Sequence, residues 1–205
     1  MIEYNNLLSF GDVLTLNYSG NCSKILKDIK EFEWKQYNPR RAINRYGLSV
    51  TSLDGKLNGI DLDSMYQYNK IHNTKYNELS FRTPTEVYYK SEETQKLIEP
   101  FKPWLCRTHF LNIKKGGYFP PHRDWRSIEK QSSFRILVPI KDCNPNRLYF
   151  IYDGKILNFN YGVPYFVNTN KEHCIFSFSD TSVMLVMNIE CTKESLIKVS
   201  ELMIG

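Results

Sequence analysis

The stretch LCRTHFLNIKKGGYFPPHRD, residues 105–124, opens the part of the chain that decides the fold. From Trp104 onward, short runs of β-branched and aromatic residues alternate with turn residues such as Gly116-Gly117 and Asp153-Gly154. The expected strands are Leu105–Ile113, Tyr118–His122, Phe134–Ile140, Arg147–Tyr152, Lys155–Asn158, Gly162–Val167, Cys174–Phe178 and Ser182–Cys191. So many short strands predict a barrel or jelly roll, because a closed or two-sheet architecture leaves few unpaired strand edges.

The residues on either side of this β-rich part have helical patterns. Apolar residues recur at helical spacing, Pro100 and Pro103 end one of the patterns, and Thr192 is a suitable N-cap for the last. The expected helices are Asn21–Phe32, Asp61–Ile71, Thr85–Ile98 and Lys193–Leu202. We therefore predict one mainly β domain over residues 1–205, with an N-terminal α/β elaboration at 1–103, a β core at 104–192 and a C-terminal helix at 193–205.

Composition limits the classes of protein. The net charge of +5 comes from 27 basic and 22 acidic residues, and the basic pairs such as Arg40-Arg41 are small enough to be solvated loop charge. Nucleic acid therefore stays among the partners to consider. The five cysteines are scattered without a CxxC pair, so we expect reduced thiols. The absence of a long apolar run predicts no membrane partner and a cytoplasmic protein.

The motif that carries chemistry is His122-Arg123-Asp124, which is joined much later in the chain by His173. Two residues that are two apart on a strand point to the same face, so His122 and Asp124 can reach one ion. A second histidine from a distant strand completes two imidazoles and one carboxylate, the set that holds ferrous iron and leaves positions open. The alternative is a surface ion pair between His122 and Asp124. We interpret His72 and His109 as structural or peripheral.

Three segments around this motif, residues 107–124, 134–140 and 161–177, resemble the Fe(II)- and 2-oxoglutarate-dependent oxygenases. The similarity is to the branch of the aspartyl/asparaginyl β-hydroxylases and proline hydroxylases. It implies a double-stranded β-helix, a cupin-like barrel, with Fe(II) on His122, Asp124 and His173. It also implies hydroxylation of an amino-acid-like, peptidyl or other small substrate by molecular oxygen, with release of succinate and CO2. The β-hydroxylase proper lacks the carboxylate ligand, whereas this chain has Asp124.

The resemblance also implies a basic residue that binds the far carboxylate of 2-oxoglutarate, about ten positions after the distal histidine. Val183 stands there instead. Because a buried dicarboxylate needs a cation, we expect Arg135 to replace it, unless Arg135 is only the exposed end of its strand. Asn112 would add a hydrogen bond, and Arg107 and Arg147 are reserve candidates.

Substrate selection is expected from loops at the barrel mouth. Trp125, Arg126 and Tyr118 flank the metal motif and are candidate substrate contacts, or else rim packing. The loops are Gly116–Phe119, Trp125–Ser133 and parts of Asn38–Lys56. Two other interpretations stay open: a cupin-type iron enzyme that does not use 2-oxoglutarate, and a non-catalytic β-barrel binding module.

Overall fold

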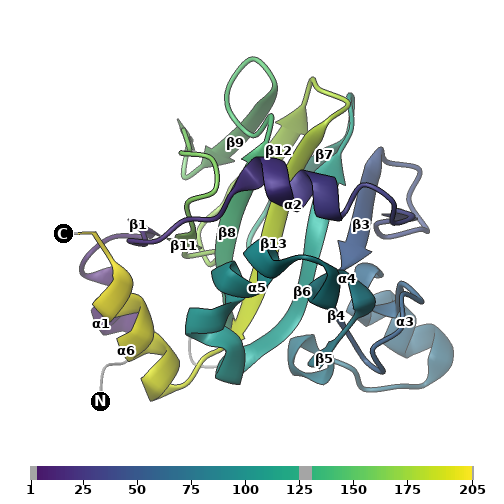
Figure 1. Ribbon diagram of the computed structural model, residues 1–205, viewed down its shortest axis with the longest axis horizontal. Coiled ribbons are helices and arrows are strands. Elements are labelled where there is room, and N and C mark those ends of the chain that lie inside the picture. The colour runs from purple at the N-terminus through teal and green to yellow at the C-terminus, as the bar shows by residue number, and fades with distance from the viewer. Residues whose placement is uncertain (1–3, 125–130, 205) are drawn as a thin grey trace.

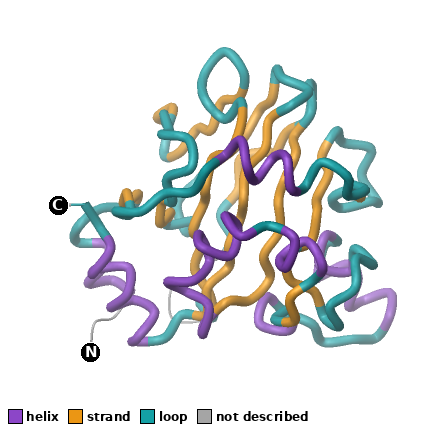
Figure 2. Tube along the Cα trace, viewed as in Figure 1, coloured by secondary structure: helices purple, strands orange, loops and turns teal. Residues whose placement is uncertain are grey.

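The computed structural model describes residues 4–124 and 131–204. Two antiparallel sheets dominate it, and helices cover the larger one (Figures 1 and 2). The larger sheet contains, from edge to edge, β1 (Val13–Thr15), β11 (Tyr165–Val167), β8 (Ser133–Lys141), β13 (Ser182–Glu190), β6 (Leu105–Ile113), β3 (Arg45–Ser49) and β2 (Lys35–Gln36). The smaller sheet contains β10 (Lys155–Ile156), β9 (Leu148–Tyr152), β12 (His173–Ser177) and β7 (Tyr118–His122). A separate ladder joins β4 (Thr51–Ser52) to β5 (Thr83–Pro84).

The eight strands from β6 to β13 follow the order of a jelly roll, also called a double-stranded β-helix. The larger sheet has the order β11-β8-β13-β6 in its centre and the smaller sheet has the order β10-β9-β12-β7. Successive strands thus pass between the two sheets, except at the β9–β10 hairpin, where Asp153 and Gly154 both have the positive φ of a tight two-residue turn. The fold predicted from the sequence is confirmed.

The helices differ from the sequence prediction mainly in the N-terminal half. They are α1 (Tyr4–Leu8), α2 (Cys22–Asp28), α3 (Met65–His72), α4 (Glu86–Lys90), α5 (Glu92–Ile98) and α6 (Lys193–Leu202), with short 3-10 turns η1 (Ile60–Leu62), η2 (Glu78–Ser80) and η3 (Glu99–Trp104). The helix expected over residues 85–98 breaks at Ser91, whose backbone is extended and whose hydroxyl caps α5. Asp61 is buried before α3 instead of capping it, and Ser64 is the cap. Thr192 caps α6 as predicted.

The two faces of the larger sheet pack against different layers. On β13, Val183 and Leu185 belong to the core beneath the helices, whereas Met184 and Val186 belong to the core between the sheets. Figure 1 shows α2 and α5 lying across β8, β13 and β6. Side chains alternate along a strand, so each long strand serves both cores.

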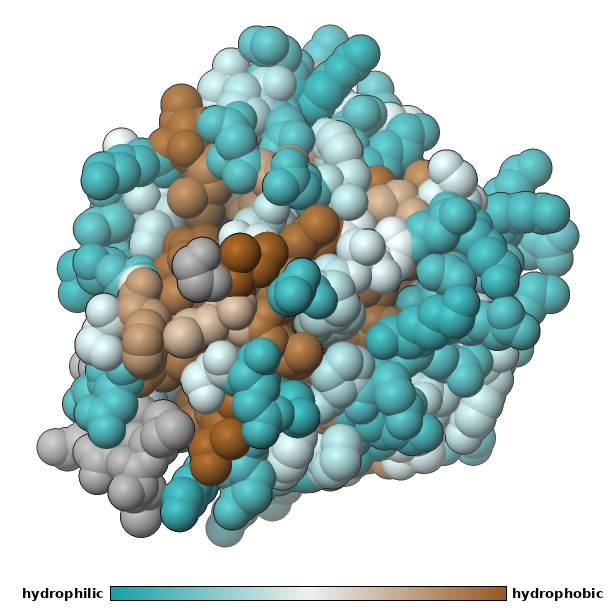
Figure 3. All heavy atoms as spheres, turned by 60° about the vertical axis from the view of Figure 1, so that its left-hand side comes forward, coloured by the Kyte–Doolittle hydropathy of each residue, from teal (hydrophilic) through white to brown (hydrophobic). Residues whose placement is uncertain are grey.

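The surface in Figure 3 is mostly hydrophilic, with hydrophobic side chains gathered near the middle of that face. Among the described residues, no helix combines the length and the apolar character needed to cross a membrane.

Candidate metal centre

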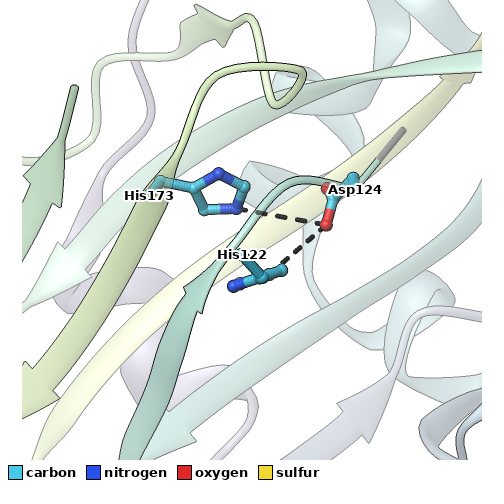
Figure 4. A group of neighbouring side chains, drawn as sticks. All are labelled: His122, Asp124 and His173. Carbon is cyan, nitrogen blue, oxygen red and sulfur yellow. Dashed lines mark ion pairs between the residues drawn. The ribbon is translucent and has the colours of Figure 1, made fainter. Parts of the chain in front are cut away.

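The two motif histidines face each other across neighbouring strands of the smaller sheet. His122 ends β7 and His173 begins β12, and the two residues are direct partners in the ladder. Asp124 follows two residues after His122, and its backbone N–H donates to the Thr169 carbonyl at 2.9 Å. The three side chains point toward one another (Figure 4), and one ligand atom from each lies within 4.8 Å of the others. The fold therefore brings together the three residues that the sequence motif selected.

Backbone carbonyls orient both imidazoles. The Nδ1 atom of His122 lies 2.7 Å from the Pro120 oxygen, and that of His173 lies 2.9 Å from the Lys171 oxygen. Because a carbonyl only accepts hydrogen bonds, each Nδ1 carries a proton and donates to its carbonyl, which turns each Nε2 toward Asp124. The Nε2 atoms lie 3.4 Å and 4.0 Å from Oδ1 of Asp124. Both Nε2 atoms thus face the carboxylate.

Asp124 is held in its ionised form by the charges around it. Burial opposes ionisation, but Arg135 and the two imidazoles hold the pKa of Asp124 well below its usual range. The Nε atom of Arg135 lies 2.8 Å from Oδ2 of Asp124, so one oxygen faces the guanidinium and the other faces the histidines. The donor set of two imidazole nitrogens and one carboxylate oxygen fits a ferrous ion, with positions left open on the far side.

A cavity of about 140 Å³ lies next to the three ligands, between the two sheets. Most of its wall is apolar, and the residues that give this character are Leu111, Leu137, Phe150, Ile175, Met184 and Val186. The polar side chains in the wall, apart from the ligands, are Tyr37, His109, Arg135 and Thr169. Arg135 therefore lines the cavity and is not only the exposed end of its strand, while its contact with 2-oxoglutarate stays a prediction.

His109 lines the same cavity and is not peripheral, which corrects the sequence interpretation. It is 2% exposed, its Nδ1 atom is buried without a hydrogen-bond partner among the described residues, and its ring centroid lies 5.4 Å from that of Tyr37. Burial and, secondarily, Arg107 and Arg135 hold the pKa of His109 well below its usual range, so the imidazole is neutral. Its two-residue spacing from Leu111 was the signal in the sequence that it shares the cavity face.

Other predicted site residues lie elsewhere. Asn112 is paired in the ladder with Val183, so its side chain is on the helix-covered face of the larger sheet and does not line the cavity. Tyr118 is 39% exposed and stacks on Phe176, outside the cavity wall. Alternation along β6 turns Asn112 away from the cavity. Tyr118 is an even number of residues from His122, and the register shift between β7 and β12 is what places Phe119, not Tyr118, on the cavity side. Trp125 and Arg126 lie outside the described residues.

The reserve arginines do not line the cavity beside the three candidate ligands. Arg107 is buried in an ion pair with Glu78 at 3.0 Å, and Arg147 is exposed. Val183 belongs to the core beneath the helices, so the residue at this end of β13 that faces the cavity is Met184. The resemblance pointed to position 183, whereas the neighbouring residue Met184 is the one that lines the cavity.

No family model matches this chain, and no curated protein matches it. Among solved structures, the chain is similar to a prolyl-4-hydroxylase from Pseudomonas putida, with 11% identity, a TM-score of 0.47, and coverage of 91% of this chain and 96% of that one. It is also similar to an oxidoreductase of the 2OG-Fe(II) oxygenase family from Burkholderia pseudomallei, with 9% identity, a TM-score of 0.45, and coverage of 82% and 76%. A third similar structure is KdgF from Halomonas sp., with 8% identity, a TM-score of 0.40, and coverage of 81% and 93%.

Proposed function

We propose that this protein is an Fe(II)-dependent oxygenase that uses 2-oxoglutarate and hydroxylates an amino-acid-like, peptidyl or other small substrate. The observation that carries the proposal is the convergence of His122, Asp124 and His173 beside a cavity whose wall contains Arg135. When bound, the metal and 2-oxoglutarate supply oxygen activation, in which the oxo acid is converted to succinate and CO2 while a substrate C–H bond gains a hydroxyl group.

The chain's own residues hold the metal, shape its surroundings and exclude water. The two imidazoles and the carboxylate would hold the ion, and the carbonyls of Pro120 and Lys171 fix the ring orientations. The apolar wall of the cavity between the sheets would keep bulk water away from the metal. Asp124 stays ionised through Arg135, so it is ready to bind a cation.

Besides its contact with Asp124, Arg135 can also bind a carboxylate group in the cavity. Its Nε atom is engaged by Asp124, and its two Nη groups have no hydrogen bond or ion pair within the described ranges 4–124 and 131–204. An edge of two N–H donors matches the two oxygens of a carboxylate, and such charge-assisted pairs are the strong ones. We therefore assign the Nη edge of Arg135 to the far carboxylate of 2-oxoglutarate.

A second candidate is an iron enzyme of the same fold that does not use 2-oxoglutarate. The apolar wall around Met184 favours it. Within the described parts of the chain, Arg135 is the only cation that lines the cavity, and it already contacts Asp124, so a carboxylate of 2-oxoglutarate would have no cation of its own. A buried carboxylate without a cation would cost several kcal/mol.

Reconstitution with Fe(II) without oxygen, followed by addition of oxygen and 2-oxoglutarate, separates the two candidates. We expect one metal per chain in the native protein, none in His173→Ala, and release of succinate that depends on the metal. Arg135→Gln should weaken 2-oxoglutarate binding by about 10- to 100-fold, the range for a hydrogen-bonded charged group.

The matched control is Arg147→Gln, which removes the same charge from an exposed site. Because Arg135 also contacts Asp124, metal content is measured for each variant before 2-oxoglutarate binding is compared. Bound iron without any succinate favours the second candidate, and a native protein that binds no metal refutes both.

A further inference from the structure

A second pocket, of about 330 Å³, adjoins the candidate metal centre and borders the cavity between the sheets. It lies between β3, β7 and the turn that follows β2. Tyr37, Phe119 and His122 line both this pocket and the cavity between the sheets. A molecule bound in this pocket would therefore lie next to the candidate metal centre.

Arg45, on β3, lines this pocket and is buried without a counter-ion. Its side chain faces the barrel because its ladder partner, Ile113, belongs to the core between the sheets. Arg45 is 3% exposed, and its Nε atom is buried without a hydrogen-bond partner. Throughout the described parts of the chain, no carboxylate lies within ion-pair distance of its guanidinium, and no oxygen accepts a hydrogen bond from it.

Aromatic rings hold this guanidinium in place. Its central carbon lies 4.2 Å from the ring centroid of Phe119 and 5.6 Å from that of Tyr37. Such contacts stabilise a cation but leave its N–H donors unsatisfied. Burial, and in the same direction the like charge of Arg41, lowers the pKa of Arg45, and the groups that affect it include no carboxylate.

The other buried charges around this pocket, Arg107 and Asp63, are already matched, which sets Arg45 apart. Arg107 contacts Glu78 at 3.0 Å and the carbonyl oxygens of Asp61 and Asp63. The carboxylate of Asp63 is bound by Arg40. The unmatched charge that remains in the pocket is therefore positive, with Arg45 at its inner end and the exposed Arg41 at its rim.

We propose that Arg45, with Arg41, binds an oxyanion of the substrate, a carboxylate or a phosphate, and so fixes the substrate beside the metal. The inference rests on the proposed function for the reaction, but not for the binding of the anion. An unpaired buried charge is costly, and a bound anion offsets this cost while it satisfies the free N–H groups. Substrates of this enzyme therefore carry an acidic group on the part that enters the pocket.

The binding step can be tested on the chain of 205 residues without metal, so that its result does not depend on any oxygenase activity. Inorganic phosphate and acetate, each titrated by calorimetry, probe the two kinds of oxyanion, and the tighter of the two identifies the group. We expect Arg45→Gln to weaken binding at least tenfold and Arg41→Gln to weaken it severalfold, since charged hydrogen bonds contribute effects of this size. Arg147→Gln, at an exposed site outside both pockets, is the control.

Three results would overturn the proposal. The first is that neither anion binds to the native protein. The second is that binding is the same in Arg45→Gln and Arg147→Gln. The third is that, in the Mn(II)-loaded protein, Arg45→Gln weakens 2-oxoglutarate tenfold, because Arg45 would then hold the co-substrate. A protein that binds the anion through Arg45 but releases no succinate refutes the proposed function alone.

Thermal stability distinguishes a binding role of Arg45 from a structural one. In buffer free of oxyanions, Arg45→Met should melt at the same temperature as the native protein or higher, because a well-packed apolar residue replaces an unpaired buried charge. Phosphate or acetate should then raise the melting temperature of the native protein and not of Arg45→Met. A melting temperature lowered by several degrees, with the anion response intact, would assign Arg45 a structural role.

Discussion

The two faces of the larger sheet differ in what they pack against and in what they carry. On the helix-covered face, β13 contributes Val183 and Leu185 to a continuous apolar core. On the opposite face, the same strand contributes Met184 and Val186 to the wall of a cavity that also contains a neutral histidine and the cation of Arg135. One face therefore packs into the larger apolar core, while the other borders an open volume lined partly by polar groups.

The largest expected effect is a difference in folding stability between two variants in which neighbouring residues, Val183 and Met184, are each changed to arginine. Val183→Arg places a charge in the helix-covered core, where nothing solvates it, and should cost several kcal/mol and prevent stable folding. Met184→Arg places the charge in the cavity wall and should leave a folded protein that binds 2-oxoglutarate more tightly. Urea unfolding and calorimetry with 2-oxoglutarate measure the two effects. Equal destabilisation by both changes would contradict the division between the faces.

Truncation of two side chains tests the same division without introducing charge. Leu185→Ala should lower the free energy of unfolding by about 2–5 kcal/mol, because a fully buried side chain leaves a void. Met184→Ala should cost less, at the lower end of about 2–5 kcal/mol, because one side of Met184 already faces a cavity. Chemical denaturation of both variants provides the measurement, and a larger loss for Met184→Ala would show that the cavity wall is the tighter core.

The barrel-facing side also carries buried charge that should make stability depend on pH. Burial raises the pKa of Asp61 from 3.8 to about 6, against the hydrogen bond from Ser49 and the charge of Arg107. The folded state then retains a proton that the unfolded state has lost, so this contribution is present below pH 4 and disappears as pH rises to about 6. At about 1.4 kcal/mol for each pKa unit, the native protein should lose about 3 kcal/mol over this interval relative to Asp61→Asn. Parallel stability profiles of the two proteins would show that Asp61 titrates normally.

The smallest effect is expected at the cap of α6, on the helix-covered side. The Thr192 hydroxyl accepts from the Ser195 backbone N–H at 3.1 Å, and the Ser195 hydroxyl accepts from the Thr192 backbone N–H at 2.9 Å. Thr192→Ala should cost about 1 kcal/mol of unfolding free energy. Metal content should not change, since the helix packs on the face that lacks the cavity. A Thr192→Ser variant, which keeps the hydroxyl, is the control, and an equal loss in both variants would exclude the cap as the cause.

The strands and the grouping of His122, Asp124 and His173 could be predicted because their signals are local or follow the period of two along a strand. Leu105–Ile113, Tyr118–His122 and Lys193–Leu202 have the predicted boundaries. Strand geometry predicted a common orientation for His122 and Asp124. In the structure β7 ends at His122, and Asp124 is placed by the hydrogen bond from its backbone N–H to Thr169. His173 was identified by its residue type and by its position at the start of a strand.

The sequence could not reveal the residues whose roles depend on the neighbours that the fold supplies. Arg45 lies within residues 38–56, which were expected to contribute a loop at the barrel mouth. In the structure it belongs to β3, which pairs with β6, and its side chain is buried beside Phe119. Val183 and Met184 differ by a single position, and a shift of one residue reverses the face to which a side chain belongs.

Residue types and their spacing thus determined the jelly roll and the candidate set of metal ligands, since the first depends on alternation within strands and the second on the chemistry of imidazole and carboxylate. The tertiary structure decided which polar groups are buried without partners, because burial and charge pairing are properties of contacts between distant segments. Arg45, Arg107 and Arg135 are the same residue type in the sequence. Only the fold leaves the first without an anion while it pairs the second with Glu78 and the third with Asp124.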